Sequence, residues 1–148
     1  MSSLRLLTAC ALIFGMANLV RATDEIAWHT DVAEAVAAAQ EKDLPLLVYV
    51  TSSHCPYCVK MKNQTLSNAA LAAEVNRGFV ALTVSRGTAP ELERRIAVRA
   101  YPTTLILRPD ESEMGRVTGY VAPAQLTGSL QRFTALHLAA KTTPAAVK

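Results

Sequence analysis

Two kinds of apolar spacing alternate along the chain and predict alternating strands and helices. Apolar segments of strand length occupy residues 44–50, 79–84, 103–107 and 115–121. Helical spacing occupies residues 31–42, 56–62, 68–78 and 88–98, and a last helix starts at Pro123. The apolar run from Leu46 to Val50 is unbroken, as in a central strand that is covered on both faces. The pattern therefore predicts one α/β domain, with a mixed sheet of about four strands and helices on both faces.

Polar residues before three of these helices are typical of helix N-caps. Thr30 or Asp31 can cap the first helix, and Asn68 can cap the third. Thr88 stands three residues before Glu91, which is the capping-box spacing. We expect these side chains to accept the free backbone N–H groups where the helices begin.

The first 22 residues differ from the rest of the chain and predict an export signal. Arg5 precedes an apolar run over residues 6–20, and Ala22 supplies a small residue after it. A membrane anchor is the alternative, but polar residues interrupt this run, which is shorter than the roughly 20 residues of a spanning helix. We expect a cleaved signal peptide over residues 1–22, a folded domain over 23–140 and a flexible tail over 141–148.

Charge is almost balanced once that signal is removed. Cleavage after Ala22 leaves 13 basic and 12 acidic residues, and this balance indicates no nucleic-acid or anionic-membrane partner. Because the apolar run leaves with the signal, we expect no stable membrane insertion of the processed protein. The cleavage also removes Cys10, so that Cys55 and Cys58 remain in a compartment where disulfides persist. The short signal and the alanine-rich composition favour a bacterial periplasm.

Cys55 and Cys58 stand where a helix is expected to begin, because Pro56 is well tolerated in a first helical turn. A thiolate attacks disulfides, so a redox cysteine needs surroundings that lower its pKa below the free value of about 8.5. The helix start offers Cys55 unpaired N–H groups, and His54 can add positive charge. Cys58 lies one turn along the same face, within reach for a disulfide. We expect Cys55 to be the nucleophile and Cys58 the resolving cysteine.

Other uses of the pair fit the sequence less well. A structural staple across so short a loop contributes about 2 kcal/mol, against about 4.7 kcal/mol for a loop of about 100 residues. Covalent haem needs a histidine where this chain has Val59, and structural zinc needs four ligands. A copper(I) site on Cys55, Cys58 and His54 remains an alternative, as does a non-catalytic module with a permanently oxidised pair. Disulfide exchange itself needs no cofactor or metal, because the cysteines carry the electrons.

From about residue 28 to residue 138 the sequence resembles the thioredoxin superfamily. Three features carry the resemblance: a buried strand that runs into a CPYC motif, an X-Pro-Thr strand start, and a glycine that closes the last strand pair. They are Cys55-Pro56-Tyr57-Cys58, Tyr101-Pro102-Thr103 and Gly119. The resemblance implies a thioredoxin-like fold in which Pro102 is cis and faces the cysteine pair. The sequence is similar in particular to exported members of this superfamily with an amino-terminal helix, such as the carboxy-terminal domain of DsbD.

The sequence departs from thioredoxin at two places near the motif. Tyr49 stands six residues before Cys55, where thioredoxin has a buried aspartate, and His54 replaces the tryptophan directly before the cysteine. Proton transfer to and from Cys58 therefore lacks an obvious carboxylate.

The resemblance also implies the function and the partners. We expect an extracytoplasmic thiol-disulfide oxidoreductase that acts on protein thiols and disulfides and exchanges electrons with an upstream redox partner. The segment that binds the substrate is expected at Tyr101, Pro102 and Thr103. Residues expected to modulate the cysteine pair are His54, Pro56 and Tyr57.

Overall fold

The computed structural model of the protein describes residues 25–142. The expected signal peptide over residues 1–22, including Cys10, lies outside the described residues. So does most of the tail that was expected over residues 141–148.

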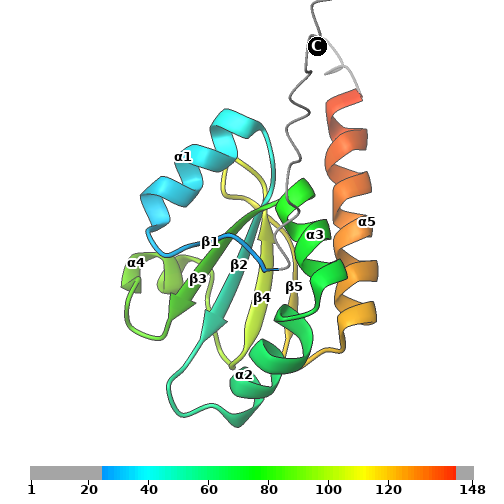
Figure 1. Cartoon of the computed structure of the whole chain (residues 1–148). Helices are drawn as coiled ribbons and strands as arrows, with labels where there is room; N and C mark the ends of the chain where they lie inside the picture. Colours follow the sequence, from blue (N-terminus) through cyan, green and yellow to red (C-terminus); the bar gives the residue numbers. More distant parts are fainter. Residues whose placement is uncertain (1–24, 143–148) are drawn as a thin grey trace, which may run out of the picture.

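A mixed five-stranded sheet in the order β1-β3-β2-β4-β5 forms the centre of the domain (Figure 1). Its strands are β1 (Trp28–His29), β2 (Leu46–Thr51), β3 (Val80–Ser85), β4 (Thr103–Leu107) and β5 (Glu113–Thr118). β1, β3 and β2 run parallel, whereas β4 is antiparallel to β2 and β5 is antiparallel to β4. The predicted α/β fold with a mixed sheet is confirmed, and β1 is an additional strand that is too short to show a period in the sequence.

Five α-helices and one π-helical segment surround this sheet in the described part of the chain. They are α1 (Val32–Lys42), α2 (Pro56–Lys60), the π-helical segment η1 (Met61–Leu66), α3 (Ala69–Gly78), α4 (Pro90–Arg95) and α5 (Pro123–Thr142). Among residues 25–142, none of these helices has the length and apolar character needed to cross a bilayer.

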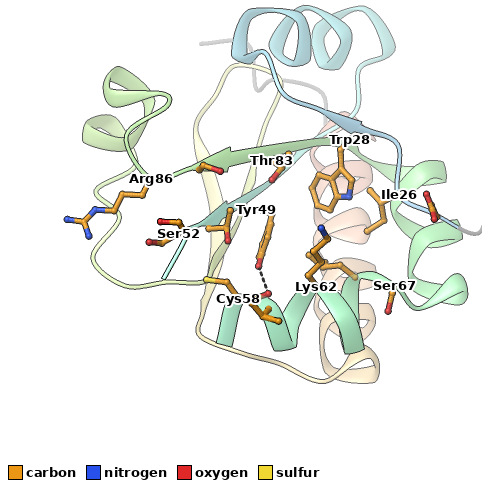
Figure 2. A pocket seen from close by; sticks show the side chains of 15 residues that line it. Ile26, Trp28, Tyr49, Ser52, Cys58, Lys62, Ser67, Thr83 and Arg86 are labelled. Atoms are coloured by element: carbon orange, nitrogen blue, oxygen red, sulfur yellow. Dashed lines mark hydrogen bonds between the residues drawn. The ribbon is translucent and has the colours of Figure 1, made fainter. Parts of the chain in front are cut away.

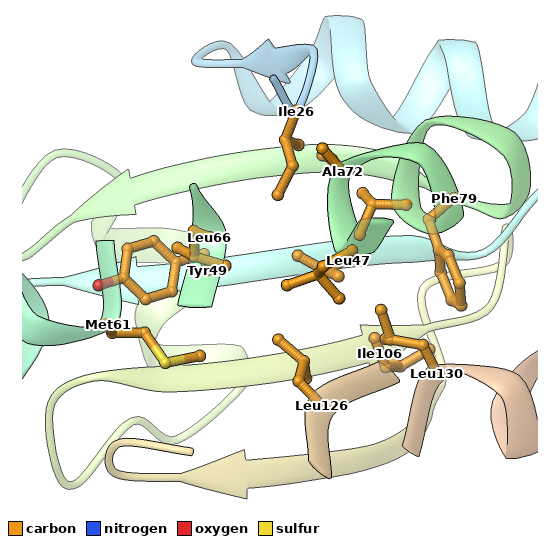
Figure 3. Packing of buried hydrophobic residues seen from close by; sticks show 13 residues of the cluster. Ile26, Leu47, Tyr49, Met61, Leu66, Ala72, Phe79, Ile106, Leu126 and Leu130 are labelled. Carbon is orange, nitrogen blue, oxygen red and sulfur yellow. The ribbon is translucent and has the colours of Figure 1, made fainter. Parts of the chain in front are cut away.

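β2 sends its side chains alternately into two hydrophobic cores. Leu47 and Tyr49 belong to the core beneath η1, α3 and α5, which Figure 3 shows in detail. Leu46, Val48 and Val50 belong to the core beneath α1 and α4. Full burial on both faces explains why this strand is apolar at almost every position. The strand that leads into the cysteine motif is thus buried on both faces and paired with a strand on each side.

Two of the expected caps are confirmed. The Asp31 carboxylate accepts the Glu34 N–H at 2.8 Å at the start of α1. The Asn68 side chain accepts the Leu71 N–H at 3.0 Å at the start of α3. Both helices therefore begin where the sequence places them.

The prediction of a capping box at Thr88 is wrong. Ala89 is the N-cap of α4, and the Thr88 hydroxyl instead donates to the Ser85 carbonyl at 2.7 Å. The carboxylate that turns back is that of Glu93, which accepts the Gly87 N–H at 2.8 Å. Because the Thr88 hydroxyl bonds within the turn after β3, it does not cap α4. The Glu93 carboxylate, further along α4, binds the loop that precedes the helix instead.

The last helix is longer than expected, because α5 includes Lys141 and ends at Thr142. The Lys141 ammonium lies 2.5 Å from a carboxylate oxygen of Asp43, the residue that ends α1. The buried His137 places its Nε2 atom 3.0 Å from the Asp43 carbonyl oxygen. These contacts hold the end of α5 against α1, so the expected tail does not begin at Lys141.

Candidate active site

The cysteine motif lies directly after β2, at the point where the chain turns into α2. Cys55 has an extended backbone and is the N-cap of α2, and Pro56 is its first helical residue. The helix start that Pro56 predicted is therefore confirmed. α2 continues into the π-helical segment η1, of which the sequence predicted only Met61 and Lys62 as helix.

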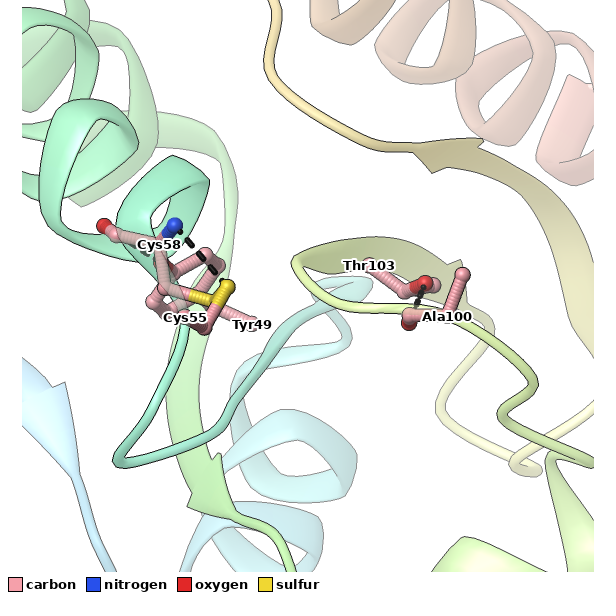
Figure 4. Close-up of a disulfide and its surroundings, with 5 residues drawn as sticks. All are labelled: Tyr49, Cys55, Cys58, Ala100 and Thr103. Atoms are coloured by element: carbon pink, nitrogen blue, oxygen red, sulfur yellow. Dashed lines mark hydrogen bonds between the residues drawn. A yellow bond between two sulfur atoms is a disulfide. The ribbon is translucent and has the colours of Figure 1, made fainter.

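Cys55 and Cys58 form a disulfide whose Cα atoms are 5.2 Å apart. Figure 4 shows the bond together with the Cys58 N–H, which donates to the Cys55 sulfur at 3.0 Å. Cys55 is half-buried, whereas Cys58 is only 4% exposed. An N–H donor aimed at the more accessible sulfur is what a thiolate at this place needs.

The Tyr101–Pro102 turn lies at the same end of the sheet as the disulfide. Val50 of β2 pairs with Thr103 of β4, so the chain enters β4 beside the point where it leaves β2. The Tyr101–Pro102 peptide bond is cis. The structure thus brings two of the three features that carry the family resemblance to the same end of the sheet.

Hydrogen bonds hold this turn in place. The Thr103 hydroxyl donates to the Ala100 carbonyl at 2.8 Å, and Figure 4 shows this bond closing the turn. The Pro102 carbonyl accepts the Gly119 N–H at 2.8 Å. Gly119 has a φ of +89°, which residues with a side chain rarely adopt. This backbone conformation explains why a glycine stands at the end of the strand pair. Pro102 and Thr103 are buried, so Tyr101, which is half-buried, presents the accessible surface.

Tyr49 is a site residue whose role the sequence did not predict. It is 5% exposed, and its hydroxyl donates to the Cys58 carbonyl at 3.2 Å. Its ring lies 6.0 Å from that of Trp28, centroid to centroid. Burial raises the pKa of Tyr49 above its ordinary value, so the hydroxyl stays protonated and remains a donor. The available signal was a phenol on a buried strand, since a buried tyrosine usually finds a hydrogen-bond partner.

The expected modulating residues are all on the outside of the motif. Tyr57 is 62% exposed, and Pro56 and His54 are exposed as well. The His54 Nδ1 atom lies 3.0 Å from the Ser53 hydroxyl oxygen, so its ring bonds to its own loop. These side chains can touch a partner protein that approaches the disulfide.

The copper alternative gains no support from the geometry. Within residues 25–142, the structure places no group of three or more His, Cys, Asp or Glu side chains where they could hold a metal ion.

Comparison with known proteins places the chain in a family. The model of the thioredoxin-like domain matches residues 32–134. The thioredoxin-related protein DsbJ of Chlamydia pneumoniae is 26% identical over 113 residues, which cover 68% of this chain and 32% of DsbJ. The chain spans only 17% and 32% of the lengths of the two curated relatives that it matches.

Solved structures give the same result. A thioredoxin from Thermus thermophilus is 32% identical and superposes with a TM-score of 0.66, covering 74% of this chain and 87% of that thioredoxin. The reduced DsbD carboxy-terminal domain of Neisseria meningitidis shares the fold at 16% identity, with a TM-score of 0.60 over 68% of this chain and 90% of that domain. Since the family model covers most of the chain, this protein belongs to the thioredoxin-like family.

Proposed function

We propose that this protein is an exported thiol-disulfide oxidoreductase that exchanges disulfides with protein substrates through Cys55 and Cys58. The observation that carries the proposal is the arrangement of the pair. Cys55, the more accessible of the two cysteines, is the N-cap of α2, and its sulfur accepts the Cys58 N–H. Cys58 itself is buried. A thiolate formed at Cys55 is stabilised by this donor, whereas Cys58 is shielded until a substrate is bound.

In the reducing direction, two exchange steps transfer two electrons. The Cys55 thiolate attacks one sulfur of a substrate disulfide, the substrate S–S bond breaks, and the released substrate thiolate takes a proton from water. Cys58 then loses its proton and attacks the Cys55 sulfur, which breaks the mixed disulfide. The second substrate sulfur leaves and accepts the proton that Cys58 gave up. The cysteine pair ends oxidised and the substrate reduced, and the same steps in reverse oxidise a substrate dithiol.

The turn at Tyr101, Pro102 and Thr103 is proposed to bind an extended segment of the substrate beside the cysteine pair. Its position at the edge where β2 ends, and the hydrogen bonds that fix its backbone, support this role. His54, Pro56 and Tyr57 are proposed to modulate the exchange, because they surround Cys55 on the accessible side.

We further propose that the protein works in a bacterial periplasm after removal of residues 1–22, leaving a domain over residues 23–140. An upstream redox protein would renew the pair, and no cofactor is needed for the exchange steps. The apolar start of the sequence and the two remaining cysteines support this location.

Reduction of insulin by dithiothreitol in the presence of the protein tests the proposal. We expect the wild-type protein to accelerate the precipitation of insulin, and a Cys55→Ser variant to lose this acceleration. A Cys58→Ser variant should instead accumulate a mixed disulfide on Cys55, because the resolving thiol is missing. Equal rates for the wild-type and the Cys55→Ser proteins would refute the proposal.

A further inference from the structure

A pocket of about 670 Å³ opens beside Cys58. Figure 2 shows the rings of Trp28 and Tyr49 side by side in its wall, with the Tyr49 hydroxyl bonded to Cys58. Ile26 and Leu66 extend the apolar wall. The volume lies within the roughly 300–1,000 Å³ of small-ligand pockets, so an aromatic side chain fits easily.

The rim of this pocket is basic. Lys62 and Arg86 line it, and both side chains are exposed. Glu25 is the only acidic residue among the described residues that line it. Figure 2 shows Arg86 and Lys62 on opposite sides of Tyr49, with the Arg86 side chain directed away from the tyrosine.

The sequence around the pocket strengthens this charge pattern. No aspartate or glutamate occurs between Asp43 and Glu74, or between Glu74 and Glu91. The same stretches supply β2, the cysteine motif, α2 and β3. Basic residues within them are Lys60, Lys62, Arg77 and Arg86, of which Arg77 pairs with Glu74. The surface that adjoins the disulfide therefore favours partners of negative charge.

Arg86 connects the pocket with the proposed substrate turn. Its guanidinium lies 5.9 Å from the centre of the Tyr101 ring, while the residue also lines the pocket. Its backbone N–H donates to the Thr51 carbonyl at 2.8 Å, which fixes the residue at the end of β2. A segment bound along Tyr101 can therefore continue past Arg86 towards Trp28.

We propose that this pocket binds an acidic segment of the protein's redox partner, with an aromatic side chain against Trp28 and a carboxylate beside Lys62 or Arg86. The inference names the class of partner for the exchange reaction and rests on the proposed function in that respect. The apolar walls fit the aromatic side chain of such a segment, and the basic rim attracts its carboxylates and would repel a basic segment.

Binding is tested without any redox step, because Trp28 is the only tryptophan of the chain. The oxidised protein is titrated with two blocked peptides that lack cysteine, Gly-Glu-Phe-Ser-Glu-Gly and Gly-Lys-Phe-Ser-Lys-Gly. We expect a saturable change of Trp28 fluorescence with the acidic peptide, and a several-fold weaker response with the basic one. Equal responses, or no response to the acidic peptide, would overturn the inference.

Two matched variants locate the binding. Lys62→Gln removes a cation from the rim. Lys60→Gln removes one from the end of α2, just before η1 and outside the pocket, where Lys60 lies 4.2 Å from the Tyr120 ring centre. We expect Lys62→Gln to weaken the acidic peptide by about two- to fivefold, the range of exposed ion pairs, and Lys60→Gln to change it little. Equal losses for both variants would indicate a diffuse charge effect and contradict a site at the pocket.

A second measurement separates this inference from the proposed function. The same two peptides are made with cysteine in place of serine, oxidised to disulfide dimers and given to the reduced protein. We expect the acidic dimer to be reduced about fivefold faster than the basic one at low salt, with a ratio near one at about 1 M salt. Reduction of both dimers at equal rates would refute the inference alone. Reduction of neither, with fluorescence binding intact, would refute the proposed function alone.

Discussion

Replacing Tyr49 with phenylalanine tests the link between the central strand and the cysteine motif. The phenol joins β2 to the first turn of α2 through its bond to the Cys58 carbonyl. The substitution removes that hydroxyl and keeps the ring that packs against Trp28. We therefore expect a modest loss of stability in the oxidised protein and an unchanged fold.

The size of the loss follows from the geometry. The bond is 3.2 Å long, and the Cys58 carbonyl also accepts the N–H of Met61, so it keeps a partner in the variant. A hydrogen bond lost under these conditions costs about 0.5–1 kcal/mol, the lower part of the usual range. Tyr49→Ala also empties a site in which the ring is 5% exposed, and should cost about 3–5 kcal/mol.

Urea denaturation of the oxidised proteins measures both values, with equal m-values as the sign that the same surface is exposed. The pH dependence adds a second criterion. Burial raises the pKa of Tyr49 in the folded state, so the stability from the neutral phenol is present below about pH 10 and is lost as pH rises through the folded pKa. The advantage of the wild type over Tyr49→Phe should shrink above that pH. A phenylalanine variant as stable as the wild type at pH 7 would refute the role given to the hydroxyl.

Three further substitutions test the surrounding structure. Gly115→Ala should cost about 1–3 kcal/mol in thermal denaturation, because a Cβ there would lie 2.5 Å from the Phe133 ring, and an unchanged Tm would contradict that close approach. Asp31→Ala should lower the free energy of unfolding by about 1 kcal/mol, because it removes the cap of α1. Asp31→Asn keeps a side-chain acceptor and should lose less stability, so equal losses for the two variants would argue against the cap. The hydrogen bond from Lys141 holds the pKa of Asp43 below its ordinary value. The stability that this pairing confers is therefore present above about pH 3.9 and is lost as pH falls through the folded pKa of Asp43. Lys141→Gln should raise that pKa in an NMR titration, and an unchanged midpoint would contradict the pairing.

Local sequence signals were sufficient for the central strand and for the helix that carries the cysteine motif. The unbroken apolar run at Leu46–Val50 identified the central strand, because both of its faces are covered. Pro56 marked the start of α2, and with it the place of Cys55 at a helix N-cap. The core of the candidate site was therefore predictable from a few neighbouring residues.

Features that depend on contacts between distant segments were not predictable in this way. β1 has two residues and exists through its pairing with β3. The pocket beside Cys58 needs Trp28 from β1, Tyr49 from β2 and Lys62 from η1 in one place, and no spacing in the sequence connects them. Thr88 shows the opposite problem, because a capping-box pattern was present and a tighter turn used the residue instead.

Alkylation of the reduced protein across a range of pH tests most directly whether Cys55 is the activated thiol. We expect iodoacetamide to modify Cys55 before Cys58, with a half-maximal rate at a pH below the value of about 8.5 for a free cysteine. A Cys58→Ser variant serves as the control, since it leaves one thiol to titrate and keeps the backbone N–H that faces it. Modification of Cys58 first, or a half-maximal rate at or above about pH 8.5, would contradict the account.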